Sequence, residues 1–306
     1  MVAPLISEDI ALDPSAFLGE YGGYIDELAI VAKAASGETL YQSSIAPSMM
    51  DKENFFERFS NIAKYLDIST YAVIHAFFDE LFHKKFKSVS LNAEEIPVSA
   101  TGFICPNKKG YWKYLAEIMV EIADLQVSGI ILLDFRYPWR KYCFCTECIR
   151  DFRMLENLPV YFHYGLLEER IDLYEKWLKW RSGVLSDALK YFINHLNSQG
   201  KNIPVIVEVI LDPISEMTSG VFEYFGQNLE ELSKSVDGFI LNIFPFSTID
   251  KDVITDDVFT GIISLNKPIY LLYTKNLTES ELEILKEIAK IVNAKKIFIK
   301  FAQIAS

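Results

Sequence analysis

The sequence has 306 residues, of which 50% are hydrophobic and 24% are charged, so it is long and apolar enough to bury a large core. Its formal net charge of −12 argues against a surface built to neutralise phosphates, because nucleic-acid binding depends on clustered lysine and arginine. We therefore expect no nucleic-acid partner. A neutral or cationic ligand suits this charge better, and the many aromatic rings are compatible with sugar binding, although most must form the core.

The first 13 residues, MVAPLISEDIALD, contain neither a basic stretch nor a long apolar run, and no segment approaches the roughly 18 apolar residues that cross a bilayer. We expect a cytoplasmic protein without membrane contact. No linker-like composition divides the chain, so we expect one domain over residues 1–306, with roughly the first 20 residues as a candidate extension. The oligomeric state is left open.

Seven short apolar runs are expected to form strands, and most are apolar on both faces, as parallel strands covered by helices are. They are residues 27–34, 69–78, 129–135, 203–210, 238–244, 268–274 and 295–301. Helical periodicity separates them, for example over 52–66, 111–125 and 277–292, the last of which opens with a capping box of Thr278 and Glu281.

This alternation predicts an α/β fold, a TIM-type (β/α)8 barrel, with an eighth strand expected near the N-terminus. In such a barrel, functional residues gather at the C-terminal ends of the strands. Two long loops, 79–109 and 137–146, follow successive predicted strands. We expect these loops to be neighbours at that end.

Four cysteines have the spacing of a metal site. Cys143, Cys145 and Cys148 form C-x-C-x2-C, and Cys105 lies in the preceding long loop. Four thiolates can enclose one tetrahedral Zn²⁺, and such a closed site is structural. The alternatives are reduced cysteines that pack as small hydrophobic residues, or a disulfide between Cys105 and one of the other three. A redox pair is disfavoured, because these cysteines lack a thioredoxin-like βαβ context.

Two carboxylates follow or interrupt apolar strands. Alternation along an extended strand places Asp134 and Arg136 on one face, where the guanidinium would hold the carboxylate ionised, as a nucleophile or a charge-stabilising group requires. Glu208 interrupts the apolar strand VIVEVI, where burial should raise its pKa toward that of a general acid. The alternative is a pair of buried structural ion pairs.

Other polar and aromatic residues near predicted strand ends are weaker candidates. His75, in VIHAFF, is either a hydrogen-bonded core residue or a donor to substrate hydroxyls. The aromatic residues after Asp134 either stack on sugars or pack around the cysteines. These further candidates are Tyr137, Trp139 and Tyr142, together with Asp212 and Asn242.

The segments IHAFF, ICPNKKGYWKYL, GIILLDFRYP and CFCTEC, in this order, resemble the glycoside hydrolase-like (β/α)8 barrel families. The cysteine spacing is also similar to that of the zinc-containing β-galactosidases of glycoside hydrolase family 42. The resemblance implies a sugar-binding C-terminal face and maps the family's aspartate, arginine and histidine onto Asp134, Arg136 and His75. The sequence departs from the usual D-x-x-R-[YF]-P motif, because Asp134 precedes Arg136 by two residues, and the Asn-Glu pair of the β-galactosidases has no counterpart.

We therefore expect a glycoside hydrolase that acts on an oligo- or polysaccharide and carries a structural zinc ion. Asp134 and Glu208 would be catalytic, and the zinc ligands would be the four cysteines. Residues expected to bind the carbohydrate or to orient the catalytic groups are His75, Arg136, Tyr137, Trp139 and Asn242. One alternative is a catalytically silent barrel that binds a glycan or a protein, and another is an enzyme with catalytic zinc.

Overall fold

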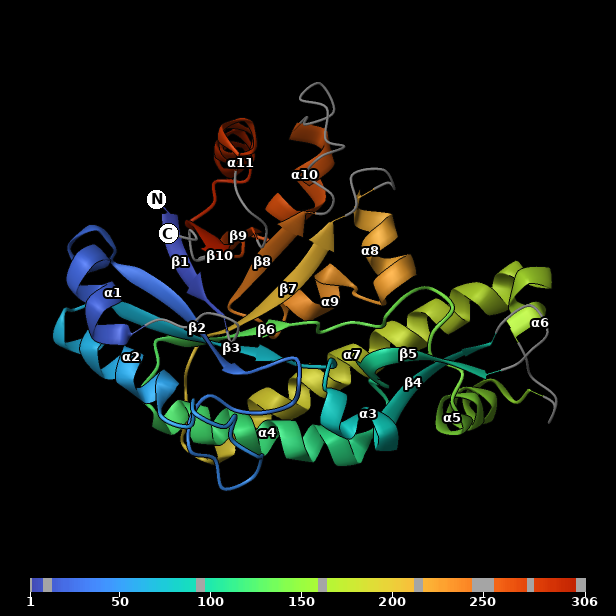
Figure 1. The fold of residues 1–306 in the computed structure, drawn as a ribbon. Helices are drawn as coiled ribbons and strands as arrows, with labels where there is room; N and C mark the ends of the chain where they lie inside the picture. Colours follow the sequence, from blue (N-terminus) through green and yellow to red (C-terminus); the bar gives the residue numbers. More distant parts are fainter. Residues whose placement is uncertain are drawn as a thin grey trace.

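The computed structural model describes residues 2–7, 13–91, 97–158, 164–211, 217–243, 256–273 and 278–300. Eight parallel strands form a closed barrel in the order β1-β10-β9-β8-β7-β6-β3-β2 (Figure 1). The strands are β1 (Val2–Ile6), β2 (Glu27–Lys33), β3 (Ser69–His75), β6 (Gly129–Leu133), β7 (Val205–Leu211), β8 (Gly238–Ile243), β9 (Ile269–Tyr273) and β10 (Lys296–Lys300). The predicted (β/α)8 barrel is confirmed.

The eighth strand, expected near the N-terminus, is β1. It pairs with β10 on one side and with β2 on the other, and so closes the barrel. Residues 2–6 are therefore part of the barrel and not an extension of it. Each of the seven predicted strands is present, but β3 ends at His75 and β6 ends at Leu133, earlier than the apolar runs indicated. His75 is thus the last residue of β3, and Asp134 directly follows β6.

An aromatic layer fills the barrel interior. The rings of Tyr71, Tyr270 and Phe298, from β3, β9 and β10, pack with centroid separations of 5.9 to 6.4 Å. Gly129 and Gly238 begin the strands beside them, and a Cβ at either position would lie 3.0 to 3.2 Å from the nearest of these tyrosine rings. The rings thus fill space that side chains at these two positions would otherwise occupy.

Helices cover the outside of the barrel. Their bounds are α1 (Pro14–Tyr21), α2 (Phe55–Tyr65), α4 (Lys109–Asp124), α5 (Thr146–Glu156), α6 (Tyr164–Glu169), α7 (Ile171–Ser198), α8 (Met217–Phe225), α9 (Leu229–Ser233), α10 (Asp256–Ile263) and α11 (Glu279–Ile291), with a 3-10 turn over Gly22–Tyr24. The capping box of Thr278 and Glu281 begins α11 as predicted. Helix α4 buries its stripe of Leu115, Ile118 and Met119. Among the described residues, no helix is long and apolar enough to cross a membrane.

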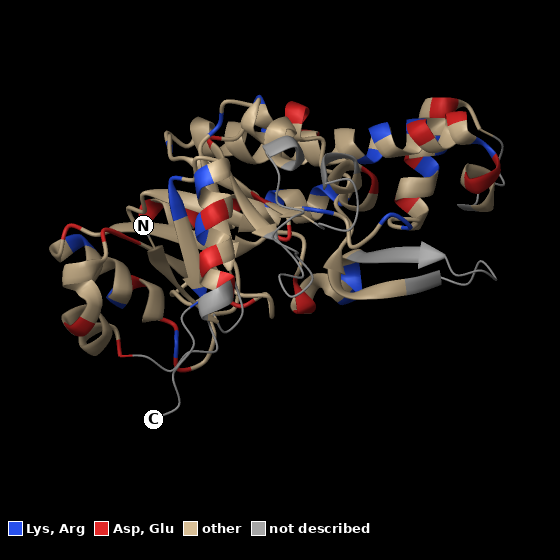
Figure 2. Cartoon of the chain, turned by 90° about the horizontal axis from the view of Figure 1, so that it is seen from above, with Lys and Arg blue, Asp and Glu red and all other residues tan. Residues whose placement is uncertain are grey.

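The segment between β3 and α4 differs from the long loop expected over 79–109. It contains α3 (Glu80–Phe86) and an antiparallel hairpin of β4 (Lys87–Leu91) and β5 (Pro97–Ile104). The hairpin was not expected from the sequence, because small and polar residues interrupt the apolar residues of both strands and leave little of the apolar pattern that marks a strand. The hairpin projects beyond the barrel on the same side as α5 and α6 (Figures 1 and 2), where the helices carry acidic and basic residues interspersed.

Candidate active site and metal cluster

Asp134 lies in a sharp turn directly after β6. Its φ angle of 53° places it in the left-handed region, and the backbone N–H of Arg136 donates to its carbonyl at 2.9 Å. The prediction that extended-strand alternation places Asp134 and Arg136 on one face is therefore wrong, because the strand ends at Leu133. The turn nevertheless brings the two side chains together, with Arg136 Nη2 3.3 Å from Asp134 Oδ1.

The Asp134 carboxylate is held between two basic side chains. His75 Nδ1 lies 2.7 Å from Asp134 Oδ2, and a carboxylate only accepts, so the imidazole donates from Nδ1. Burial by itself raises the pKa of Asp134, but the hydrogen bond from His75 and the charges of His75, Arg136 and Lys33 outweigh it, so the pKa lies below its ordinary value. The side chain keeps 18% of its surface exposed. Asp134 is thus an ionised carboxylate with a solvent-facing edge.

Glu208 occupies the opposite kind of environment. It lies on β7 and is only 4% exposed. Its Oε2 accepts the backbone N–H of Asp134 at 2.7 Å, and its Oε1 accepts from Asn242 Nδ2 at 2.8 Å. Burial and the nearby Asp134 charge raise its pKa above the ordinary value, although Arg136 and these hydrogen bonds oppose the rise. The predicted contrast between the two carboxyl groups is therefore present.

Gln227, which no sequence pattern singled out, connects the segment after Asp134 to the strand that carries Glu208. It is 1% exposed, and its Nε2 donates to the carbonyls of Phe135 at 2.9 Å and of Glu208 at 2.7 Å. Gln227 lies between α8 and α9, where no local pattern distinguishes it from a surface glutamine. Only its contacts identify it as a support of the site.

Arg136 is fixed by two aromatic rings. Its guanidinium carbon lies 4.8 Å from the ring centroid of Phe103 on β5 and 5.1 Å from that of Phe225 on α8. Its Nη1 also donates to the carbonyls of Tyr137 and Pro138, at 3.3 and 3.4 Å. The projecting hairpin therefore reaches the candidate site through Phe103.

The aromatic candidates separate into buried and exposed groups. Tyr137 is fully buried, and the guanidinium carbon of Arg181 lies 4.4 Å from its ring centroid. Tyr142 packs, partly buried, against the core. Trp139 is 42% exposed and stacks on Tyr224 at 4.4 Å, which leaves part of its ring accessible to a ligand. Asp212 lies outside the described residues.

The four cysteines form one buried cluster. Cys105 follows β5, Cys143 and Cys145 lie in the loop after β6, and Cys148 lies on α5. Their Sγ atoms all lie within 4.8 Å of one another, with Cys105 at 3.4 Å from Cys148 and 3.6 Å from Cys145. A disulfide requires about 2.05 Å, and all four cysteines are free thiols. The expectation that the two loops are neighbours is confirmed.

The separations of the sulfur atoms fit a tetrahedral ion. Zn–S bonds of about 2.3 Å place the sulfurs of a regular tetrahedron about 3.8 Å apart. The backbone N–H of Cys145 donates to Cys143 Sγ at 3.4 Å, as backbone amides do toward metal-bound thiolates. Nearby, Lys108 and Glu147 form an ion pair that joins the loop after β5 to α5. The donor set is therefore suited to a metal that prefers soft ligands.

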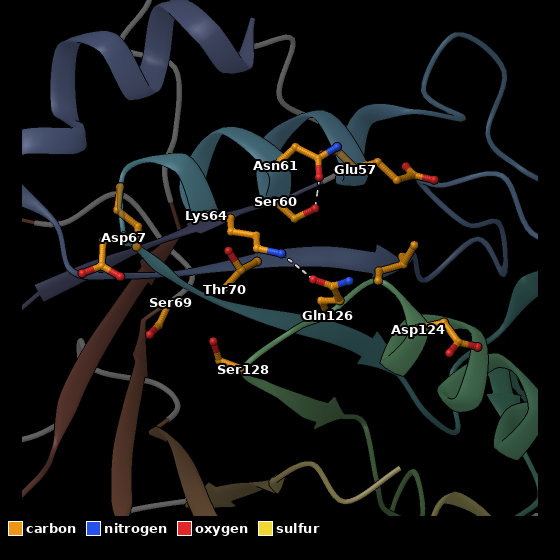
Figure 3. Close-up of a pocket in the computed structure, with 12 residues that line it drawn as sticks. Glu57, Ser60, Asn61, Lys64, Asp67, Ser69, Thr70, Asp124, Gln126 and Ser128 are labelled. Carbon is orange, nitrogen blue, oxygen red and sulfur yellow. Dashed lines mark hydrogen bonds between the residues drawn. The ribbon is translucent and has the colours of Figure 1, made fainter. Parts of the chain in front are cut away.

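A polar pocket lies at the other end of the barrel. It is a cavity of about 510 Å³ between α2 and α4, at the N-terminal ends of β3 and β6 (Figure 3). Lys64 reaches across it to Gln126, with Nζ 2.5 Å from Oε1, and Ser60, Thr70 and Ser128 contribute hydroxyl groups. None of the predicted site residues lines this pocket.

Neither a protein-family model nor a curated protein matches the sequence. Solved structures with a similar fold include the glycoside hydrolase domain of PgaB (BpsB) from Bordetella bronchiseptica, with a TM-score of 0.72 and 12% identity over 98% of this chain and 93% of that one. The glycoside hydrolase domain of PelA from Pseudomonas aeruginosa has a TM-score of 0.53 and 9% identity, over 98% and 94%.

A β-galactosidase from the psychrophilic Marinomonas ef1 is also similar, with a TM-score of 0.64 and 8% identity over 98% of this chain. This chain spans about half of that enzyme, 54% of its length. At such identities the likeness shows the fold alone. The protein has the (β/α)8 fold of glycoside hydrolase domains, which agrees with the fold that the sequence motifs implied.

Proposed function

We propose that this protein is a glycoside hydrolase that acts on an oligo- or polysaccharide through Asp134 and Glu208. The observation that supports it is the joining of two carboxyl groups with opposite pKa shifts, one directly after β6 and one within the neighbouring strand β7, where Glu208 accepts the N–H of Asp134. Glycosidic bond cleavage uses such a pair, one carboxylate kept ionised and one carboxyl group that retains a proton. Other glycoside hydrolase domains are built on the same fold.

In this proposal Asp134 is the nucleophile, or the carboxylate that stabilises the developing positive charge on the sugar, because its own partners keep it ionised. Glu208 is the general acid, because its environment favours the protonated form. Arg136 and His75 orient Asp134, and His75 and Asn242 contact sugar hydroxyls. Trp139 offers an exposed ring face on which a sugar can stack. Tyr137, which is buried, supports the loop from within.

The four-cysteine cluster is proposed to hold a structural zinc ion. Bound there, zinc would supply no open coordination position, and its role would be to join the end of β5 to the loop after β6. The loop so held begins at the turn that carries Asp134 and Arg136. The cytoplasmic location expected from the sequence stays a prediction.

A second candidate function is a catalytically silent barrel that binds a glycan. It is favoured by one observation: Glu208 is nearly buried and both of its oxygens already accept N–H groups, as a structural carboxylate's do. In that case the polar network would maintain the shape of the site without transferring a proton. Sugar binding would then occur without bond cleavage.

The test is release of reducing sugar by the purified, zinc-replete protein from a panel of α- and β-linked oligosaccharides. The Asp134→Asn variant is compared with Asp124→Asn, the same substitution at an exposed position near the opposite end of the barrel. Release by wild type and by Asp124→Asn, but not by Asp134→Asn, supports the proposal. Binding of a sugar without release from any substrate would replace it with the silent barrel.

A further inference from the structure

We propose that Lys33 and Asp79 form a positioning pair, a buried ion pair that fixes the end of β3 from which His75 reaches Asp134. Neither residue belongs to the carboxylate pair described above. The catalytic consequence of this pair rests on the proposed function. Its structural consequence does not, and the two are measured separately below.

The pair is enclosed within the protein. Lys33 is the last residue of β2, and Asp79 immediately precedes α3. Both side chains are 0% exposed, and Lys33 Nζ lies 2.9 Å from Asp79 Oδ2. The same ammonium group donates to the carbonyl of His75 at 3.1 Å. One buried cation therefore contacts both the acid and the backbone of the residue that hydrogen-bonds Asp134.

Asp79 is held from three further directions. Its Oδ1 accepts the backbone N–H of Phe82 at 2.8 Å, and its Oδ2 accepts the hydroxyl of Tyr111 on α4 at 3.2 Å. Gly37 passes close above it with a φ of 97°, and a Cβ at this position would lie 2.4 Å from Asp79 Oδ1. The carboxylate thus has a single arrangement, and it anchors Lys33.

The segment after β3 lies between this pair and the turn at Asp134. The backbone N–H of Ala76 donates to the carbonyl of Leu133 at 2.8 Å, and the backbone N–H of Phe77 donates to the carbonyl of Asp134 at 3.3 Å. His75 itself is held by Lys33 through its carbonyl and by Asp134 through its ring. A shift of the pair would therefore change the direction from which the imidazole meets the carboxylate.

Stability alone does not account for a fully enclosed ion pair. Burial removes both charges from water, and apolar residues of similar size often stabilise a protein equally well. Lys296 offers a comparison: it is also nearly buried, but its partner Asp26, 2.6 Å away, is 77% exposed and keeps its hydration. Neither Lys33 nor Asp79 is in contact with water, and both lie beside the candidate site. This location is the reason to assign them a positioning role.

The test uses the double variant Lys33→Met/Asp79→Asn, which removes both charges and retains an oxygen acceptor beside Phe82 and Tyr111. The Asp134 carboxyl carbon is titrated by NMR, with His75, Arg136 and Glu208 as the other charged or titratable groups that face it. We expect the Asp134 midpoint to rise by about 0.5 unit or more, on the scale of charge and hydrogen-bond effects on carboxyl groups. Lys296→Met is the matched control and should leave the midpoint unchanged.

If the double variant does not fold, Tyr111→Phe replaces it, because this change loosens Asp79 while both charges remain; a smaller rise in the same direction is expected. An Asp134 midpoint equal to that of wild type in either folded variant would overturn the inference. With an active wild type, kcat should also fall about 10-fold in the double variant while KM is unchanged, as misplacement of a catalytic group predicts. A wild type that cleaves no substrate overturns the proposed function only, because the titration still tests the pair.

Discussion

The two ends of the barrel use charged residues in different ways. At the N-terminal end, Lys296 pairs with Asp26, a carboxylate that is 77% exposed, and the pocket at this end is lined by hydroxyl and amide groups together with charged side chains such as Lys64 and Asp124. At the C-terminal end, Lys33 and Asp79 are both fully enclosed, and Glu208 is nearly so. Charges that remain in contact with water are common on any protein surface. Charges that are enclosed need several fixed partners, and here those partners converge on one site.

This difference agrees with the general division of labour in (β/α)8 barrels, in which functional residues occupy the C-terminal face and residues at the N-terminal face mainly serve stability. In this protein the two ends also differ in the residues that adopt left-handed backbone angles. The left-handed residues Asp67 and Gln126 form ordinary turns between helices and strands at the N-terminal end, whereas the left-handed Asp134 carries a candidate catalytic group. The following predictions test this contrast.

The largest effect is expected from the cysteine cluster, which is found only at the C-terminal side. Cys105→Ser should abolish tight zinc binding and lower the melting temperature by roughly 10 °C, because a few kcal/mol of lost metal stabilisation shifts a domain of this size by that amount. Metal content and thermal unfolding measure both. Wild type treated with a chelator is the control and should unfold at the same temperature as the variant. Full retention of zinc by Cys105→Ser would instead point to a site completed by a non-thiol ligand, as catalytic zinc requires.

Two glycines with left-handed backbones allow a matched comparison of the two ends. Gly37→Ala places a Cβ against Asp79 and should destabilise the fold by about 2 to 4 kcal/mol, from backbone strain and the clash together. Gly200→Ala, after α7, meets no atom within 4 Å and should show only the strain, about 1 kcal/mol. Denaturant unfolding measures both free energies. Equal losses would mean that the enclosure of Asp79 contributes nothing beyond the backbone angle.

The two carboxyl groups should change stability in opposite directions with pH. Because the pKa of Asp134 is lowered on folding, its ionisation stabilises the native state above the unfolded value of about 3.9, and this contribution disappears as the pH falls through the folded pKa. Asp134→Asn should therefore lose more stability at pH 7 than at pH 3. The pKa of Glu208 is raised, so its contribution is present below about 4.3 and is lost as the pH rises through the folded pKa.

The stability of Glu208→Gln relative to wild type should consequently rise from pH 3 to pH 7. The relative stability of Asp134→Asn should fall over the same range. Chemical denaturation at several pH values between these limits gives both slopes. Asp124→Asn, the same substitution at an exposed position outside the site, serves as the comparison variant. Slopes of the same sign for the two site variants would show that the contrast between the carboxyl groups does not exist in solution.

Much of the fold follows from local pattern. Apolar runs locate the seven strands, the Thr278 and Glu281 pair marks the start of α11, and the spacing of the cysteines indicates a cluster that the structure contains. Asp134 and Glu208 also stand out, since an acid at the end of an apolar run or within one is uncommon. These features depend on side-chain periodicity and on residue types within a few positions of one another.

The remaining features depend on contacts between distant parts of the chain. Lys33 donates to the carbonyl of His75, which is 42 residues away in the sequence. Gln227 donates to the carbonyl of Phe135, which is 92 residues away. The turn at Asp134 likewise replaces the extended strand that its neighbours predicted. The sequence by itself determined the barrel and most of the candidate site residues, because periodicity and composition are local. Only the tertiary structure decided which of these residues are enclosed, paired and aimed at one another, because burial and charge pairing are set by the closure of the barrel.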